Sequence, residues 1–499
     1  MHKRESWPRL IATLIGLACI SGGIWRLEVE RAGISITPLA VGSTPATVYR
    51  REAGAPAPAV IIAHGFAGSR QLMEAYALTL ARAGYVAVSF DFEGHGRNPT
   101  SMSGDVTRID GTTQFLMREV GRVTDAALGL PGVDGRVALL GHSMASDIIV
   151  RRAIADPRIS ATVAVSMFSE AVTASEPRNL LIVTGEWEPL LRKDALRNAR
   201  LADPSAGEGV TVGDPGRSTG RRAVVAPSVE HVGVLYSQTA LRETRFWLDA
   251  VFQRTSSGPV SATGGPIILL LLGIVVLAWP LAGMLPRGDR APSSLPLHTF
   301  LLAVLVPAVL TPVALSFVDT HFLPVLVADY LAAHLLVYGL IALGLLVWNG
   351  VKIGHLSWVS ALALAGYGIL VFGGALDRYV ASFTPGSSRI PIIFAIALGA
   401  VPFMIADSLT LEAGRATLWR VLVARGAFIA SLGAAVALDF HRLFFLLIIM
   451  PVIVVFFTIF GLMAGWVGRS TDSPFACGLA LGLILAWALG VSFPMSARG

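Results

Sequence analysis

The chain has little of what cross-links or charges a typical soluble protein. Its 499 residues include only two cysteines, Cys19 and Cys477, and charged residues make up 14% of the sequence. Two cysteines so far apart exclude a disulfide framework and a cysteine-ligated zinc site. Lysine and arginine exceed the acidic residues by six, without a basic cluster interleaved with aromatic residues. Nucleic acid is therefore not an expected partner.

What the chain does have is apolar sequence, concentrated after residue 265. Hydrophobic residues make up 54% of the chain, more than a soluble protein normally carries. Residues 27–254 have the composition of a globular domain, whereas residues 266–499 are a succession of long apolar segments. We therefore expect at least two domains, joined by a polar linker at residues 255–265.

The first 26 residues predict a membrane anchor. Three basic residues lie within the first nine positions, and an apolar run at residues 10–25 follows. A cleaved signal peptide has the same design but ends in a small-residue cleavage site, which Ser21-Gly22-Gly23 matches poorly. We expect an uncleaved anchor, with a signal peptide as the alternative.

Eight further apolar segments follow, each with about the 20 residues that a bilayer requires. They cover residues 266–285, 297–318, 324–348, 356–376, 390–408, 421–438, 443–465 and 475–495. With the anchor they predict nine membrane spans, eight of them in a C-terminal transmembrane domain.

Basic residues gather in alternate loops between these segments. The side shared with the N-terminus holds Arg287, Arg290, Lys352, Arg415, Arg420 and Arg469. The opposite loops hold Arg378, Arg389 and Arg442. By the positive-inside rule the domain at 27–254 lies outside the cytoplasm. We expect an integral protein of the bacterial cytoplasmic membrane, with its N-terminus inside.

Ionisable residues within membrane segments are costly and often functional. Asp329 and Asp407 fall near segment ends, where we expect them to reach water, and Arg425 is expected to extend to the cytoplasmic face. His334 is interior and is expected to form a hydrogen bond with a neighbouring helix. No ion-pathway motif or internal repeat accompanies them, so transport is not expected.

Residues 27–254 alternate between strand-like and helix-like patterns, which predicts a mostly parallel sheet covered by helices on both faces. Strands are expected at residues 34–41, 47–51, 59–63, 86–90, 137–140, 162–166, 180–184 and 223–226. Helices are expected at 70–83, 114–128, 145–155, 193–201 and 238–252. The predicted fold class is α/β with a doubly wound sheet, joined to an all-α transmembrane domain.

One predicted turn in this domain has the pattern of a nucleophile. An apolar strand ends at Gly141, the chain turns through Ser143, and a helical pattern begins at Ala145. A serine on such a turn has an exposed hydroxyl, and the amide of Met144 lies beside any oxyanion that forms there. Ala145 stands where the usual pattern has a second glycine, so the match is G-x-S-x-A.

A serine nucleophile needs a base, and the base needs an acid. Histidine supplies the base, and a carboxylate fixes its tautomer and stabilises its charged form. His231 follows the last predicted strand, and Glu188 follows the strand before it, so all three residues are expected at the same edge of the parallel sheet, in the chain order serine, acid, base. Glu186 and Glu170 are alternative acids.

Five short stretches of the domain belong together by their order. They are Val60-Ile61-Ile62-Ala63-His64-Gly65-Phe66-Ala67-Gly68, Asp91-Phe92-Glu93-Gly94-His95-Gly96, Gly141-His142-Ser143-Met144-Ala145, Gly185-Glu186-Trp187-Glu188-Pro189 and Ser228-Val229-Glu230-His231. Through them residues 30–254 resemble the α/β-hydrolase superfamily, in the style of dienelactone hydrolases and prolyl oligopeptidases.

The resemblance implies an oxyanion hole made by the backbone amides of Phe66 and Met144. It places Glu188 where relatives usually carry aspartate. His64, His95 and His142 are interpreted as structural residues that hold loops by hydrogen bonds, since their spacing does not suggest metal ligands. No metal or other cofactor is expected.

Together the two halves predict a polytopic membrane serine hydrolase that cleaves ester or thioester bonds in small-molecule or lipid-like acyl substrates. Only about a dozen residues join the strands at 162–166 and 180–184, within the usual loop range, so a large lid is not expected. The site is then open, or covered by the membrane domain or by residues 202–220. An acyltransferase with the same triad, or a non-catalytic membrane receptor or transport component, are the alternatives.

Overall fold

The computed structural model describes residues 6–105, 109–288 and 294–497, which fall into two compact units. The helical unit comprises Met1–Gly22, Leu269–Ala375 and Phe383–Phe493. The sheet unit comprises Gly23–Ile268, Leu376–Ser382 and Pro494–Gly499. Lys3, Arg4 and Arg290, whose charges contribute to the predicted orientation, lie outside the described residues.

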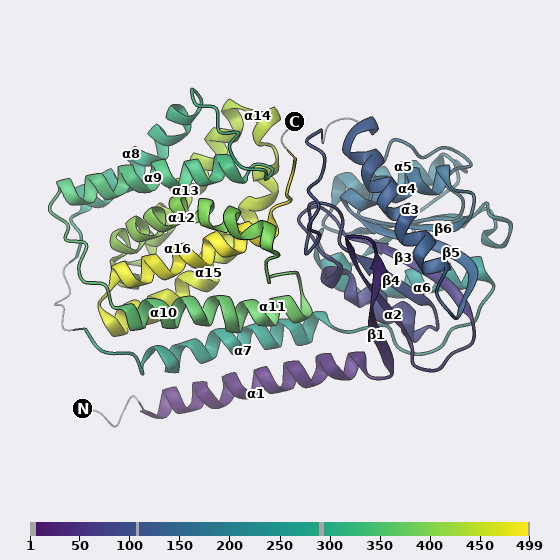
Figure 1. Ribbon diagram of the computed structural model, residues 1–499, viewed down its shortest axis with the longest axis horizontal. Helices are drawn as coiled ribbons and strands as arrows, with labels where there is room; N and C mark the ends of the chain where they lie inside the picture. The colour runs from purple at the N-terminus through teal and green to yellow at the C-terminus, as the bar shows by residue number, and fades with distance from the viewer. Residues whose placement is uncertain (1–5, 106–108, 289–293, 498–499) are drawn as a thin grey trace. The chain divides into compact units, whose positions relative to one another are not determined.

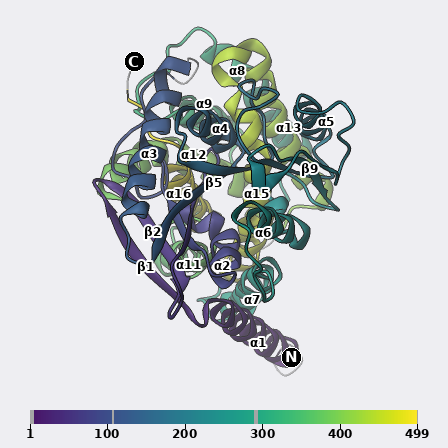
Figure 2. The same cartoon turned by 90° about the vertical axis from the view of Figure 1, so that its right-hand side faces the viewer.

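The sheet unit is built on a nine-stranded sheet in the order β1-β2-β4-β3-β5-β6-β7-β9-β8 (Figure 1). Figure 2 shows β1 and β2 at one edge, with β9 toward the other. All neighbouring pairs from β4 to β9 are parallel, and the edge pairs β1–β2, β2–β4 and β8–β9 are antiparallel. The strands are β1 (Ile34–Val41), β2 (Thr44–Arg51), β3 (Ala57–Ala63), β4 (Val86–Phe90), β5 (Val133–His142), β6 (Ile159–Val165), β7 (Leu180–Gly185), β8 (Thr211–Val212) and β9 (Arg221–Ala226).

Helices cover both faces of this sheet. The helices are α2 (Glu74–Arg82), α3 (Gln114–Leu128), α4 (Met144–Ala155), α5 (Pro189–Arg200) and α6 (Gln238–Phe252). Val60 and Ile62 pack toward α2 and α6, whereas Ala59 and Ile61 pack toward α3 and α4. Successive strand residues point to opposite faces, so a strand buried on both sides is apolar throughout. The predicted α/β class with a doubly wound, mostly parallel sheet is confirmed.

The segment at residues 255–265, predicted to be a polar linker, is packed onto the sheet unit. Ser261 is fully buried, and its N–H donates to Thr79 Oγ1 at 2.9 Å. Its carbonyl accepts a hydrogen bond from Gln238 at 2.7 Å, and the N–H of Ala262 donates to Glu30 at 3.2 Å. These bonds satisfy the backbone as secondary structure would, so the segment has a defined path.

Within the described residues, nine helices are long and apolar enough to cross a membrane, the number that the hydropathy pattern predicts. They are compatible with an integral membrane protein. The helices are α1 (Ser6–Arg31), α7 (Gly264–Ala282), α8 (Leu297–Leu315), α9 (Ala328–Trp348), α10 (Trp358–Gly366) continued by α11 (Gly373–Tyr379), α12 (Ile390–Thr410), α13 (Leu418–Leu438), α15 (Phe445–Thr471) and α16 (Pro474–Ser492), with a short α14 (Phe440–Leu443) before α15.

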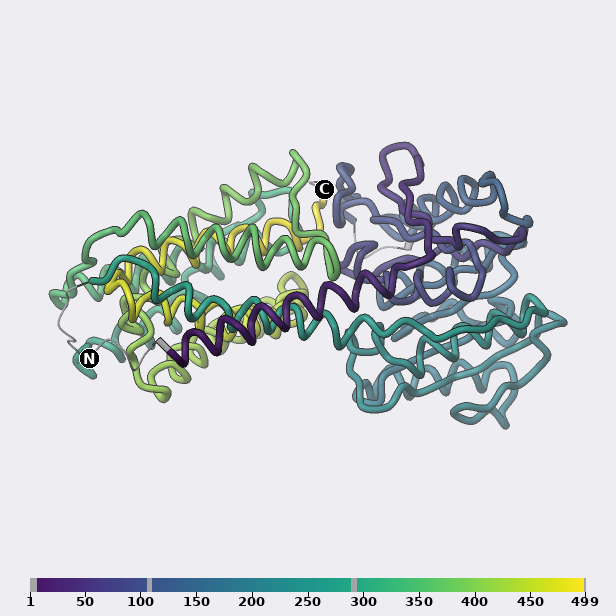
Figure 3. Tube along the Cα trace, turned by 90° about the horizontal axis from the view of Figure 1, so that it is seen from below, coloured from purple at the N-terminus to yellow at the C-terminus, as the bar shows by residue number. Residues whose placement is uncertain are grey.

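Helices α1 and α7 run side by side (Figures 1 and 3). Their backbones approach closely at Gly16 and Gly273, where a Cβ on Gly273 would lie 2.9 Å from the carbonyl oxygen of Gly16. Small residues at such a crossing let two membrane helices gain van der Waals contact that larger side chains would prevent.

Some ionisable side chains of the helical unit have polar partners within it, and Asp329, predicted to reach water, is instead buried. Arg425 Nη2 lies 2.9 Å from Asp407 Oδ2, an ion pair that the sequence pattern did not predict. Pairing avoids leaving either charge alone in an apolar bundle. Ser431 Oγ lies 3.1 Å from His334 Nε2, the interhelical hydrogen bond predicted for His334.

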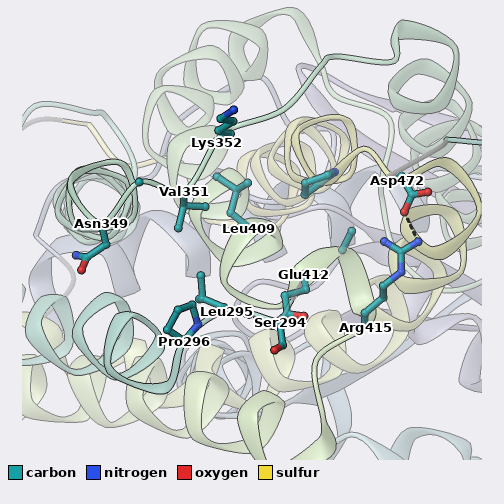
Figure 4. A pocket seen from close by; sticks show the side chains of 13 residues that line it. Ser294, Leu295, Pro296, Asn349, Val351, Lys352, Leu409, Glu412, Arg415 and Asp472 are labelled. Atoms are coloured by element: carbon teal, nitrogen blue, oxygen red, sulfur yellow. Dashed lines mark hydrogen bonds and ion pairs between the residues drawn. The ribbon is translucent and has the colours of Figure 1, made fainter. Parts of the chain in front are cut away.

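A cavity of about 350 Å³ lies among loops at one end of the helical unit (Figure 4). Its two acidic side chains are neutralised by arginines: Asp472 pairs with Arg415, and Glu412 pairs with Arg420 at 3.0 Å. Glu412 also accepts the N–H of Leu295 at 2.9 Å. The Arg415–Asp472 pair and the hydrogen bond from Leu295 to Glu412 join loops that are distant in sequence.

Candidate active site

The turn between β5 and α4 consists of Ser143 alone. Its φ of 54° and ψ of −119° lie in a region that residues with a side chain rarely adopt. Close approach of strand and helix enforces this geometry, because a Cβ on Gly141 would lie only 2.9 Å from the carbonyl oxygen of Ala145. The methyl group of Ala145 is buried in the core between sheet and helices. Gly141 is thus required, whereas alanine fits at position 145.

Ser143, His231 and Glu188 meet at the carboxyl edge of the sheet. Ser143 Oγ lies 2.8 Å from His231 Nε2, and His231 Nδ1 lies 2.5 Å from Glu188 Oε1. A proton on Nδ1 that is donated to the carboxylate leaves the Nε2 lone pair facing the serine hydroxyl, which is the tautomer a general base needs. Ser143 is half-buried.

The environment of Glu188 keeps its carboxylate ionised. Its Oε2 atom accepts hydrogen bonds from Ser166 Oγ at 2.8 Å and from the N–H of Gly185 at 2.6 Å. Burial alone raises the pKa of Glu188, but the hydrogen bonds that the carboxylate accepts outweigh burial and hold the pKa below its ordinary value. The sequence analysis missed Ser166; its position directly after β6, next to the strand that leads to Glu188, was the available signal.

The two alternative acids are not beside His231. Glu186 Oε2 accepts the N–H of Ser228 at 2.7 Å, which braces the loop that carries His231. Glu170 is exposed beyond β6. Among these three glutamates, the structure brings Glu188 alone to the imidazole.

The three histidines interpreted as structural form hydrogen bonds to loops. His142 Nε2 lies 2.8 Å from the carbonyl oxygen of His231, and burial lowers the pKa of His142 to about 3. The neutral ring therefore donates Nε2–H and ties His231 to the strand end. His64 Nε2 accepts the N–H of Phe92 at 3.1 Å, and His95 Nδ1 lies 3.0 Å from the carbonyl oxygen of Glu93.

The predicted oxyanion donors belong to residues next to Ser143. Met144 is the first residue of α4, so its N–H is among the amides that lack an intrahelical acceptor. Gly65, which precedes Phe66, approaches so closely that a Cβ on it would lie 3.0 Å from Ser143 Cβ. The loop that carries Phe66 and the N-terminus of α4 thus both lie next to Ser143.

The segment at residues 202–220 does not cover this site. It contains β8, which pairs with Arg221 and Arg222 at the start of β9, whereas His231 follows the other end of that strand. Large exposed apolar side chains flank the triad residues and Ser166 in the sequence: Phe168 follows β6, Trp187 precedes Glu188, Leu190 lies in the first turn of α5, and Val232 follows His231. In the part of the chain that the structure describes, no three His, Cys, Asp or Glu side chains are arranged to hold a metal ion.

Comparison with known proteins agrees with this fold. A profile of the family described as serine aminopeptidase, S33 matches residues 54–193, about a quarter of the chain. None of the curated proteins compared with the sequence matches it. The family match and the observed sheet support an α/β-hydrolase and a hydrolytic activity.

Three solved structures similar to the chain each cover less than half of it. A hypothetical protein from Pseudomonas aeruginosa shares 14% identity over 44% of this chain and 94% of its own, with a TM-score of 0.33. A predicted CIB-like hydrolase from Thermoplasma acidophilum shares 14% identity over 43% of this chain and 97% of its own, with a TM-score of 0.34. An epoxide hydrolase variant from Vigna radiata shares 12% identity over 44% of this chain and 99% of its own, with a TM-score of 0.31. At such values these neighbours say nothing about substrate.

Proposed function

We propose that this protein is a membrane-bound serine hydrolase that cleaves carboxylic esters or thioesters through an acyl-enzyme. The observation that carries the proposal is the hydrogen-bonded series Ser143–His231–Glu188, with separations of 2.8 and 2.5 Å. A serine held in a strained turn and bonded to an oriented imidazole is the arrangement that nucleophilic acyl transfer requires.

In the first half of the proposed reaction, Ser143 Oγ attacks the acyl carbonyl carbon while His231 Nε2 takes its proton. The carbonyl oxygen becomes an anion and accepts hydrogen bonds from the amides of Phe66 and Met144. Glu188 stabilises the imidazolium that forms. The carbon–oxygen or carbon–sulfur bond to the leaving group then breaks, and His231 returns the proton to the departing alcohol or thiol.

In the second half, water attacks the acyl-enzyme with His231 again as general base, which releases the acid and restores Ser143. The exposed Phe168, Trp187, Leu190 and Val232 support an apolar acyl group in the substrate, because such side chains gain free energy when a hydrocarbon covers them. Transfer of the acyl group to another alcohol uses the same intermediate and is the closest alternative.

A fluorophosphonate probe tests the proposal directly. The purified full-length protein should be labelled at Ser143 and should hydrolyse short p-nitrophenyl esters and acyl thioesters. Aminoacyl amides belong in the same assay, since the matched family is described as an aminopeptidase. A protein that is folded, unlabelled and inactive on every substrate would instead favour a non-catalytic binding role.

We further propose that the triad functions outside the cytoplasm of a bacterial cell, which the distribution of basic residues supports. A cysteine in place of the exposed Ser257, in a protein whose Cys19 and Cys477 are changed to alanine, should react with an impermeant maleimide added to intact spheroplasts. A cysteine in place of the exposed Lys352 should react only after lysis. The reverse pattern would place the triad in the cytoplasm.

A further inference from the structure

Two segments far along the chain belong to the sheet unit rather than to the helices that they adjoin. Leu376–Ser382 comprises the last turn of α11 and the three residues after it, and Pro494–Gly499 follows α16. A hydrolase domain that needed only residues 27–254 would not include them. Both segments contact loops of the sheet unit at residues 64–69 and 91–102. Arg378 and Tyr379 of the first segment also contact Glu28 at the end of α1.

The segment after α16 pairs with the second of these loops by backbone hydrogen bonds. The N–H of Met495 donates to the carbonyl oxygen of Gly94 at 2.8 Å, and the N–H of Met102 donates to that of Met495 at 2.9 Å. Ala497 N–H then donates to Met102 at 2.7 Å. Met495 and Met102 are each 2% exposed. Gly94 has a φ of 78°, and a Cβ there would lie 2.5 Å from the Met495 oxygen, so the fit depends on glycine.

The segment Leu376–Ser382 contacts both loops. The N–H of Ser382 donates to Ser69 Oγ at 3.0 Å, and this hydrogen bond is buried. Asp377 Oδ2 lies 2.5 Å from Arg97 Nη2. The N–H of Arg97 in turn donates to Asp91 Oδ2 at 3.0 Å. The side chain of Asp91 is fully buried, and it also pairs with Arg70.

These two loops lie against the oxyanion side of the triad. Phe92 N–H binds His64, the residue before Gly65. The ring of His95, next to Gly94, lies 5.2 Å from the His64 ring and 6.0 Å, edge to face, from the Phe66 ring. A displacement of residues 91–102 is therefore passed through packed rings to the peptide whose N–H belongs to Phe66.

From this series of contacts we propose that Asp377, Ser382 and Met495 are positioning residues of the active site. They hold the loops at 64–69 and 91–102 so that the amide of Phe66 meets the developing oxyanion. The inference rests on the proposed function, since it concerns the oxyanion of an acyl-transfer reaction. It makes hydrolysis dependent on segments that adjoin the helices, beyond the residues that carry the triad.

The test is a pair of disruptive variants of the full-length protein in detergent micelles. Met495→Pro removes the N–H donated to Gly94, and Asp377→Ala removes the partner of Arg97. Each should lower kcat for a short p-nitrophenyl ester by about 10-fold or more, because misplacing a reacting group by an ångström has effects of this size. KM should change by less than about two-fold, since ground-state binding of the acyl group is untouched.

Matched variants separate positioning from general damage. Met495→Leu keeps the N–H and the apolar volume, Asp377→Glu keeps the charge, and both should restore most of kcat. Arg378→Ala breaks the pair with Glu28, 3.1 Å apart, and the contact with the Tyr379 ring; it leaves the contacts with the two loops in place and should leave kcat unchanged. All rates are divided by the amount of Ser143 that a fluorophosphonate labels at completion, so an unfolded fraction does not count.

The outcomes distinguish this inference from the proposed function. If wild-type protein hydrolyses the ester but Met495→Pro and Asp377→Ala have wild-type kcat per labelled serine, the positioning role is wrong and the triad stands. The positioning role is also wrong if Met495→Leu and Asp377→Glu lose as much kcat as Met495→Pro and Asp377→Ala. If wild-type protein neither hydrolyses esters nor is labelled, the proposed function itself fails.

Discussion

Replacing Ser143 by alanine is expected to abolish ester hydrolysis, with kcat/KM lower by about 10⁴-fold or more. Alanine cannot form the acyl-enzyme, and the residual rate reflects only binding and the oxyanion amides. The hydroxyl is half-buried and contributes little to packing, so the melting temperature should stay close to that of the wild type. Hydrolysis of a short p-nitrophenyl ester, with fluorophosphonate labelling as the second readout, measures both effects.

His231→Ala should lose nearly as much activity, and the double variant Ser143→Ala/His231→Ala should lose little more. Members of a triad act as a unit, so their effects do not add. Retention of more than a few per cent of the wild-type rate by either single variant would show that another nucleophile or base performs the reaction.

Glu188→Gln is expected to lower kcat by about 10⁴-fold while leaving the fold intact. The amide group can donate a hydrogen bond to His231 Nδ1, which would place the imidazole proton on Nε2. That tautomer cannot accept the proton of Ser143, and the neutral amide no longer stabilises the imidazolium. Steady-state kinetics at neutral pH, together with a melting curve, measures the effect.

Two related variants serve as controls for Glu188→Gln. Glu186→Gln should stay within about two-fold of the wild type, because an exposed side chain that still accepts the N–H of Ser228 changes little. Glu188→Asp draws the carboxylate back by about 1.5 Å, and its kcat should lie between those of Glu186→Gln and Glu188→Gln. A larger loss in Glu186→Gln than in Glu188→Gln would overturn the choice of acid.

Local features of this protein could be predicted because local physics decides them. Hydrophobic periodicity predicted α3 and α6 with their observed bounds, because apolar residues at helical spacing lie on one face of a helix, which then packs against the core. The turn at Ser143 was visible because small residues must flank a serine between a strand and a helix in contact. The nine long apolar helices could be counted because a bilayer imposes a minimum length.

The sequence by itself thus determined the fold class, the nucleophile turn and the order of serine, acid and base. Tertiary structure alone decided which glutamate reaches His231, because Glu186 and Glu188 are two residues apart and their directions depend on the turn after β7. It likewise decided that Asp407 pairs with Arg425, and that Met495 binds Gly94 some 400 positions earlier in the chain. Such long-range partners leave no local pattern in the sequence, because nothing in the neighbouring residues shows whether a side chain or amide will face solvent or a distant segment. Only the folded chain brings these groups within hydrogen-bond distance.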